Sequence, residues 1–424
     1  MTTNLNRQLL TLTTLTLAVS SGVQAAFLDD SKTSVDSRTF YFQNDYRDGS
    51  GQNRVEESAQ GLTFRFQSGY TEGDIGLGLD AALMYGLKLD SSPQRSGSGL
   101  LPRNAESRPG GPSYARESQD EYSKLALTAK VRLYQDTQVL VGTINPSLGV
   151  LQPSTTRLFP QDFRGTQVTN TSITGLTLRA GRLDRARHRD STDYQGIGIA
   201  YANGQYPRTD NRDFKYAAAD YALGKDVVLS YNIGELEDVY RQHFVGIKGK
   251  LPAGPGRLVS DIRLFASREA GAGDAGAIDN RVYSGLFGYE WNGHTLQAGY
   301  QKVDGKGAYP QLENTATYLH TEMMLTNFAK QNQASWLARY DYNFAAAGLP
   351  GLMLTVRYVK SDNAHVVGVQ HDGRERELDT DIGYVVQSGT FKDLAVRWRH
   401  GVLRSNYQRN SDQDRLIVDY SFKF

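Results

Sequence analysis

The segment that most constrains the fold runs from Arg415 to Phe424, where apolar and polar side chains alternate up to a terminal aromatic residue. Side chains of a β-strand point to opposite faces in turn, so this segment has one apolar and one polar face. Leu416, Val418, Tyr420, Phe422 and Phe424 form the apolar face, and Arg415, Asp419, Ser421 and Lys423 form the polar one. A transmembrane β-barrel requires this pattern, because its wall separates lipid from a watery lumen. An amphipathic edge strand of a soluble sheet is the alternative.

Residues 1–25 have the pattern of a secretory signal peptide cleaved after Ala25. Arg7 is their only charged residue, a short apolar and threonine-rich stretch follows it, and Val23-Gln24-Ala25 supplies the small residues of a cleavage site. The sequence contains no run of the roughly 18 apolar residues that a transmembrane helix requires. We therefore predict an exported protein whose residues 26–424 form one barrel domain.

Composition excludes several classes of protein. Lys and Arg number 47 and Asp and Glu 46, so removal of Arg7 leaves a formally neutral chain, unlike the basic excess of nucleic-acid binders. The absence of cysteine excludes disulfides and thiolate metal sites. Only 39% of residues are hydrophobic, while Gly numbers 43 and Tyr 25. This composition fits a barrel wall, in which every second residue faces water, better than a dense globular core.

Short alternating segments separated by turn residues recur along the chain, and helical periodicity is nearly absent. They cover residues 62–67, 75–80, 125–133, 176–179, 228–233, 336–341, 352–358 and 394–399. At about 10 residues per strand plus connections, the chain has room for roughly 16 to 18 strands. We predict an all-β, antiparallel transmembrane barrel, and a barrel this wide encloses an aqueous channel.

Three stretches do not alternate. Residues 91–119 are rich in Ser, Gly, Pro and Arg and predict an external loop. Residues 145–174 contain prolines, which the interior of a sheet excludes, yet they are less polar than an exposed loop. A loop folded into the lumen, where it narrows the channel, reconciles these properties, and residues 302–334 have similar character. An ordinary external loop is the alternative for both.

Several sequence blocks carry a family resemblance. They are Ser37 to Phe42, Gln60 to Leu62, Arg157 to Gln161, Gly175 to Arg182, Glu235 to Phe244, Tyr283 to Tyr289, Ala338 to Tyr342, Asp379 to Gly389 and Val396 to Arg399. Together they resemble the OprD (Occ) porin family of pseudomonads, the outer-membrane carboxylate channels. The blocks span essentially the whole of residues 26–424. His320, Met323 and Met324 depart from the family pattern, which leaves the substrate open.

The resemblance implies an 18-stranded barrel in the outer membrane of a Gram-negative bacterium, surrounded by lipid and lipopolysaccharide. It implies a pore within one chain, with a loose homo-oligomer as an option, and a ladder of basic side chains that conducts small carboxylates. The ladder carries over as Arg38, Arg65, Lys130, Arg132, Arg157, Arg179, Arg397 and Arg399. Candidates for the constriction are Arg164, Tyr309, Tyr318 and Asp381, the two tyrosines providing an apolar side opposite the ladder.

A ladder of this kind has a physical rationale. A carboxylate loses water on entering a narrow pore, and guanidinium groups replace that hydration with bidentate hydrogen bonds. Several spaced arginines keep each site weak enough to release the solute to the next. Alternatively, the lumen arginines only brace the wall by pairing with Asp36, Asp80, Asp341, Asp381 and Asp419. The pore would then be a general, non-selective diffusion porin.

Other functions have less support in the sequence. The seven histidines show no metal-ligand spacing, so we predict no metal and no cofactor. Gly97-Ser98-Gly99 lacks the Gly-x-Ser-x-Gly spacing of a nucleophile elbow. A serine hydrolase also needs a Ser-His-Asp arrangement in space, which sequence cannot show. A structural or adhesive barrel does not need so many inward arginines. We therefore predict a channel, not an enzyme.

Overall fold

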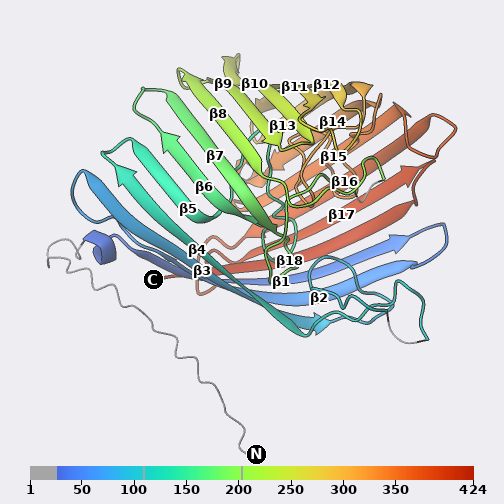
Figure 1. Cartoon of the computed structure of the whole chain (residues 1–424), viewed down its shortest axis with the longest axis horizontal. Coiled ribbons are helices and arrows are strands. Elements are labelled where there is room, and N and C mark those ends of the chain that lie inside the picture. Colours follow the sequence, from blue (N-terminus) through green and yellow to red (C-terminus); the bar gives the residue numbers. More distant parts are fainter. Residues whose placement is uncertain (1–25, 108–109, 202–203) are drawn as a thin grey trace, which may run out of the picture.

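The structure, a computed structural model, describes residues 26–107, 110–201 and 204–424. Within these residues the chain forms a single sheet of 18 strands, each antiparallel to its neighbours. The first strand pairs with the second and also with the last, so the sheet closes into a barrel (Figure 1). The predicted all-β barrel is confirmed. The predicted signal peptide, residues 1–25, lies outside the described residues.

Consecutive strands are neighbours throughout the barrel. In chain order they are β1 (Lys32–Tyr46), β2 (Arg54–Gln67), β3 (Ile75–Asp90), β4 (Glu121–Leu133), β5 (Thr137–Ile144), β6 (Asp162–Asn170), β7 (Leu176–Arg187), β8 (Phe214–Leu223), β9 (Val227–Leu236), β10 (Tyr240–Ala253), β11 (Gly256–Glu269), β12 (Asp279–Trp291), β13 (His294–Lys306), β14 (Ala334–Asn343), β15 (Leu352–Ala364), β16 (Gly373–Val385), β17 (Ala395–Ser405) and β18 (Ser411–Lys423). A short 3-10 helix, η1 (Phe344–Ala347), follows β14. No helix in the described part of the chain is both long and apolar enough to span a membrane.

The outward face of the wall is apolar because alternate residues of each strand are large hydrophobics. Leu83 in the middle of β3 is 50% exposed, and its cross-strand neighbours Phe64 and Leu125 are 47% and 54% exposed. A soluble protein rarely exposes so continuous an apolar surface. Lipid supplies the missing burial, so the amphipathic alternation seen in the sequence is that of a transmembrane wall.

We expect the replacement Leu83→Arg to destabilise the barrel by about 2–4 kcal/mol, because it places a charge near the middle of the apolar band. The same replacement at Leu89, one residue from the end of β3, should cost at most about 1 kcal/mol. Denaturant unfolding in lipid vesicles measures both values. Equal costs at the two positions would contradict a membrane-depth effect.

The two ends of the barrel differ. One end has the short turns and both termini of the described chain, and we call it the turn end. The other end, the loop end, carries the long connections. Loops 145–161, 188–213 and 307–333 reach one another through isolated backbone bridges, Gln152 to Ala316 and Ile199 to Leu312.

The predicted bounds of the two inward loops were too wide. β6 occupies residues 162–170 of the first predicted loop, and β13 extends to Lys306 at the start of the second. Polar residues such as Thr166 and Gln167 hid the strand pattern of β6. A register shift between Arg164 and Gly165 also interrupts its alternation.

The inward loops pack on the lumen wall through apolar side chains. Val150, Ile197 and Leu312, one from each loop, belong to a single buried cluster with Phe214 and Phe244 of the wall. Gly149 permits this contact, because a Cβ at that position would overlap the Phe244 ring. The loops are therefore fixed to the wall by hydrophobic burial.

Loop 91–120 is also partly buried, which corrects the prediction of a simple external loop. Leu100 and Leu101 are fully buried against Met84 and Phe159. The buried Glu57 carboxylate of β2 accepts hydrogen bonds from the Ser98 backbone N–H and from the hydroxyls of Ser91 and Ser118. A polar composition hid this anchoring, because the serines bind a carboxylate of the wall instead of water.

Candidate functional site: a cationic constriction in the lumen

Four predicted ladder residues lie on adjacent strands of the closed barrel. Arg397 and Arg399 are on β17, Arg38 is on β1 and Arg65 is on β2, and β18 lies between β17 and β1. Each lies on the strand face opposite the exposed apolar residues, as the alternation predicts. These four side chains therefore share one sector of the lumen wall.

Each of these four arginines is paired with a wall carboxylate. The Arg38 guanidinium lies 2.7 Å from Asp419, and that of Arg65 lies 2.8 Å from Asp36. Asp381, predicted at the constriction, pairs with both Arg397 and Arg399. The bracing interaction considered from the sequence is thus present at these positions.

Lys130 and Arg132 lie on β4, separated from Arg65 by the single strand β3, and Arg179 lies on β7. Lys130 on β4 is buried, lies 2.6 Å from Asp80 and donates to the Ser68 carbonyl in the turn after β2. The guanidinium of Arg132 lies over the Tyr70 ring of the same turn. Arg179 on β7 pairs with Asp220 at 2.9 Å. The predicted ladder is therefore continuous from β17 through β1 and β2 to β4, and only Arg179 on β7 lies apart from it.

Arg157 of loop 145–161 is held where the loop meets the sector that carries Arg38. Its Nε donates to the Ser98 carbonyl at 2.5 Å, which joins it to loop 91–120. Arg38 donates to the Arg157 carbonyl at 3.0 Å, and the Arg157 guanidinium lies 4.7 Å from the centre of the Phe42 ring. The neighbouring Leu158 and Phe159 are buried and anchor the loop.

Two further arginines, which the sequence did not single out for the ladder, join Arg157. Arg189 of loop 188–213 donates to the Thr156 hydroxyl, which also accepts a hydrogen bond from Arg157. Arg415 of β18 is buried on the other side, with its guanidinium 5.7 Å from the centre of the Phe42 ring. Thr156 and Phe42 therefore link the three guanidinium groups, which we call the cationic cluster: Arg157, Arg189 and Arg415.

The cationic cluster is only partly offset by nearby carboxylates, that of Asp190 acting on Arg157 and Arg189 and those of Asp379 and Glu377 acting on Arg415. Within the described residues, none of its three arginines forms an ion pair. Arg157 and Arg189 are half-buried and keep surface toward the lumen, whereas Arg415 is 2% exposed. Burial, and then the like charges of Arg415 and Arg189, lower the pKa of Arg157 below its ordinary value. Two reachable cations with a third behind them form a site for an anion.

Loop 307–333 is fixed to the neighbouring wall by carboxylates. Glu377 accepts hydrogen bonds from the backbone N–H groups of Leu325 and Thr326, and Asp379 accepts one from Met324. Arg415 also donates to the Met324 carbonyl. The acidic residues of β16 therefore hold the loop beside the cationic cluster.

Three constriction candidates occupy different places. Tyr318 is half-buried, with the Arg263 guanidinium 3.9 Å from its ring centre. Tyr309 is buried against Phe265 and offers little surface to a solute. Arg164 belongs to β6 and pairs with Asp184; it is a wall residue and not part of the loop.

A row of Ser284, His320 and Asp261, in which the first two are hydrogen-bonded, bears on the hydrolase alternative. The Ser284 hydroxyl lies 2.8 Å from His320 Nδ1, and His320 Nε2 lies 3.4 Å from Asp261. Ser284 is 2% exposed, and Asp261 also binds the Arg263 guanidinium. A nucleophile must reach its substrate, and the buried Ser284 hydroxyl does not. The contacts among these three residues instead help to fix His320, and with it loop 307–333, to the wall. Among the described residues, no group of three or more His, Asp or Glu is placed to hold a metal ion.

His188 joins two of the inward loops. Its Nδ1 lies 2.6 Å from the Gln195 amide nitrogen in loop 188–213 and 2.9 Å from that of Asn314 in loop 307–333. Burial lowers the pKa of His188 to about 4, and the nearby positive charge of Arg189 acts in the same direction. The ring is therefore neutral at physiological pH.

We expect this loop contact to weaken in acid. The folded-state pKa of His188 lies below its ordinary value of 6.5, so its stabilising effect is complete above that pH and is lost toward about pH 4. Hydrogen exchange of residues 188–201 should increase over this range more in the wild type than in His188→Asn. Parallel profiles for the two proteins would exclude His188 as the cause.

Fold and site together define a transmembrane β-barrel channel whose lumen is narrowed by inward loops at a cationic site. Comparison with known proteins identifies the family: residues 25–424 match the model of the OprD family of outer membrane porins. The chain is 33% identical to the porin-like protein GalP of Pseudomonas putida, with 96% of each covered. The structure of OccK9 (OpdG) from Pseudomonas aeruginosa is 37% identical, with a TM-score of 0.88 over 94% of this chain and all of that chain. OpdK from the same organism is 36% identical, with a TM-score of 0.86 over 94% of this chain and 100% of that one.

The chain belongs to the OprD family. It is an outer-membrane porin of the Gram-negative type, a channel for small solutes and not an enzyme. The resemblance of the sequence blocks is confirmed.

Proposed function

We propose that this porin is selective for small solutes bearing a carboxylate, which pass the cationic cluster and continue along Arg38 and Arg397 toward the turn end. The observation that carries the proposal is that Arg157 and Arg189 face the lumen without an ion-pair partner in the described part of the chain. Since Arg38 and Arg397 are 36% and 51% exposed despite their pairs, a carboxylate can exchange with Asp419 or Asp381 there. The relative OpdK was solved with vanillate, an aromatic carboxylate, which supports this solute class.

One chain is sufficient for the proposed pathway, because β1 and β18 close the barrel around it. We propose that a single chain conducts, that lipid and lipopolysaccharide surround it, and that any homo-oligomer is loose. Solutes cross passively and without a cofactor.

Solute entry into liposomes carrying the refolded protein tests the selectivity. Gluconate, glucose and glucosamine are close in size and differ in charge. We expect gluconate to enter fastest and glucosamine slowest. Equal rates would show that the protein is a general diffusion pore whose arginines only brace the wall. The ion pairs of β17 and β1 are the observation in favour of that alternative.

A further inference from the structure

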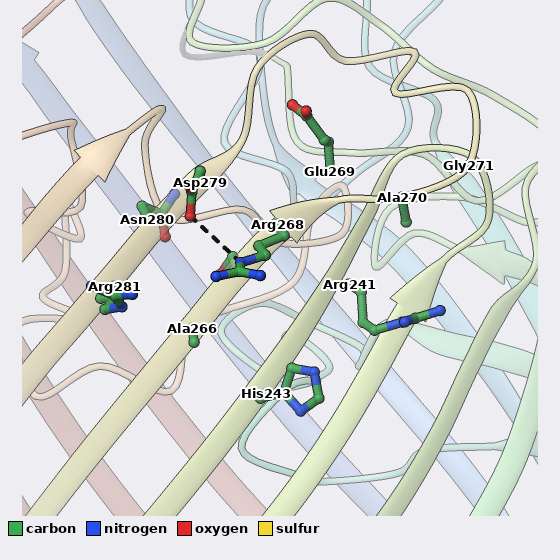
Figure 2. A pocket seen from close by; sticks show the side chains of 11 residues that line it. Arg241, His243, Ala266, Arg268, Glu269, Ala270, Gly271, Asp279, Asn280 and Arg281 are labelled. Atoms are coloured by element: carbon green, nitrogen blue, oxygen red, sulfur yellow. Dashed lines mark ion pairs between the residues drawn. The ribbon is translucent and has the colours of Figure 1, made fainter.

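A second group of basic side chains lies on the outward face of the wall, away from the lumen (Figure 2). Cross-strand pairing places Ala266 of β11 between His243 of β10 and Arg281 of β12. Arg241 and Arg268 occupy the next outward row toward the loop end. The small Ala266 side chain leaves a depression of about 520 Å³ among these groups, which we call the cationic hollow.

The cationic hollow lies at the edge of the apolar band. The next outward row toward the membrane centre is Val245, Leu264 and Tyr283, which are 43%, 40% and 45% exposed. Phe244 and Phe265, which lie between these two rows, are buried on the lumen side, so the alternation is unbroken. Two residues along a strand span about 7 Å. The hollow is therefore at the height of lipid headgroups in the outer leaflet.

The charges of the hollow suit a phosphate. Arg281 forms no ion pair among the described residues. Arg268 lies 3.7 Å from Asp279, and both are largely exposed, so this pair contributes little stability. Arg241 pairs with the partly exposed Glu235. The lining therefore carries Arg241, Arg268 and Arg281 against the two carboxylates of Glu269 and Asp279, an excess of positive charge. Guanidinium groups bind phosphate with paired hydrogen bonds. Because a phosphate carries more charge than the carboxylate of Asp279 or Glu235, it can compete with them for Arg268 and Arg241.

An apolar hollow of about 430 Å³ continues from the cationic hollow toward the membrane centre. Leu264 and Tyr283, the row directly below the cationic hollow, are part of its lining. Gly285 supplies its floor, because the position has no side chain, and Tyr300 and Trp336 form a rim with ring centres 4.7 Å apart. A basic hollow at headgroup height above an apolar hollow matches a lipid with an anionic head.

We propose that this face of β10 to β14 binds a phosphorylated glycolipid of the outer leaflet. A head phosphate occupies the cationic hollow between Arg268 and Arg281, and one acyl chain lies over Gly285. The charge complementarity, the depth of the hollow and the adjoining apolar hollow favour this occupant over a second copy of the protein. The site is separate from the solute pathway, so its test does not depend on the proposed function.

Native mass spectrometry of the detergent-solubilised protein, titrated with purified lipid A, tests the proposal. We expect lipid A to bind about tenfold more tightly than its dephosphorylated form. This ratio corresponds to about 1.4 kcal/mol of binding free energy from the phosphate contacts. Inorganic phosphate at the same concentration should not displace it, because it lacks the acyl contact. The double variant Arg268→Ser with Arg281→Ser should lose the preference for the phosphorylated form. Gly285→Leu should weaken the binding of both forms of lipid A, because the added side chain fills the apolar hollow.

The double variant Lys360→Ser with Arg376→Ser provides the matched control, because it also removes two exposed basic side chains that are cross-strand neighbours. Arg376 is exposed on β16, two residues from the exposed Leu378, at a position equivalent to that of Arg281 relative to Tyr283. Lipid binding should be unchanged in this control, and wild-type channel conductance in every variant would verify folding. Equal binding of both lipid A forms, or equal loss in the control, would overturn the proposal. A change of oligomeric state in Gly285→Leu without a change in lipid binding would assign this face to contact between copies.

Discussion

Replacing Arg157 and Arg189 together by Gln is expected to reduce gluconate flux about tenfold or more while glucose flux stays nearly constant. Hydrogen bonds to charged groups contribute roughly 1.5–3 kcal/mol, and both replaced groups face the lumen without an ion-pair partner. Gln retains an amide that can donate to the Ser98 carbonyl, the contact that now positions Arg157. Liposome entry of both solutes, measured at one ionic strength, gives the two rates.

The control for this experiment is the pair of substitutions Arg179→Gln and Arg339→Gln. Both arginines are partly exposed and paired with carboxylates, Asp220 and Asp341, so the control removes the same formal charge from the barrel. We expect a much smaller change in gluconate flux. A parallel loss of glucose and gluconate flux in the Arg157 and Arg189 variant would instead show that these residues hold the loops in place.

The double substitution Glu377→Ala with Asp379→Ala is expected to release loop 307–333 from the wall. It removes the acceptors of the Met324, Leu325 and Thr326 backbone N–H groups. An orphaned buried donor costs at least about 1 kcal/mol. The Met324 donor is buried while those of Leu325 and Thr326 are partly buried, so undocking should become easier by about 2 kcal/mol, or roughly thirtyfold. Planar-bilayer recordings should show higher and noisier conductance, with weaker selectivity.

Glu377→Gln separates loss of the anchor from loss of charge. Its amide oxygen retains one of the two acceptors for the loop, and Asp379 still accepts from Met324, so we expect a much smaller rise in conductance than in the double Ala variant. Increased conductance in Glu377→Gln equal to that of the double Ala variant would mean that charge in the lumen, and not loop docking, sets the current. Unchanged conductance in both would contradict the role of loop 307–333 in narrowing the channel.

The wall of the barrel was predictable from sequence because its alternation is a local property. The facing of Trp336 and Leu337 illustrates this: the first is 66% exposed and the second 5%. Arg415 was correctly placed on the polar face of the last strand. Its membership of the cationic cluster depends on the Phe42 ring, which lies on a strand at the other end of the chain.

The loops were less predictable because their conformation depends on the wall that they contact. Arg189 lies in loop 188–213, where no periodicity distinguishes a lumen-facing arginine from a solvated one. Tyr309 and Tyr318 lie in the same predicted loop, and nothing in the sequence distinguishes them. Tertiary packing buries Tyr309 and leaves Tyr318 partly exposed. Arg164 was misplaced because a register shift disrupts the pattern of its strand.

The pairing of β1 with β18 has a consequence for biogenesis. Arg38 and Asp419, 381 residues apart, meet across this seam, and Phe42 and Arg415 are cross-strand partners there. Contacts so distant in sequence form late, because the whole intervening chain must be ordered first. The seam between the first and last strands thus carries part of the proposed solute pathway. An incompletely assembled barrel therefore lacks its final seal together with the contact of Phe42 and Arg415 that completes the cationic cluster, so closure of the wall and completion of the proposed recognition site occur in the same step.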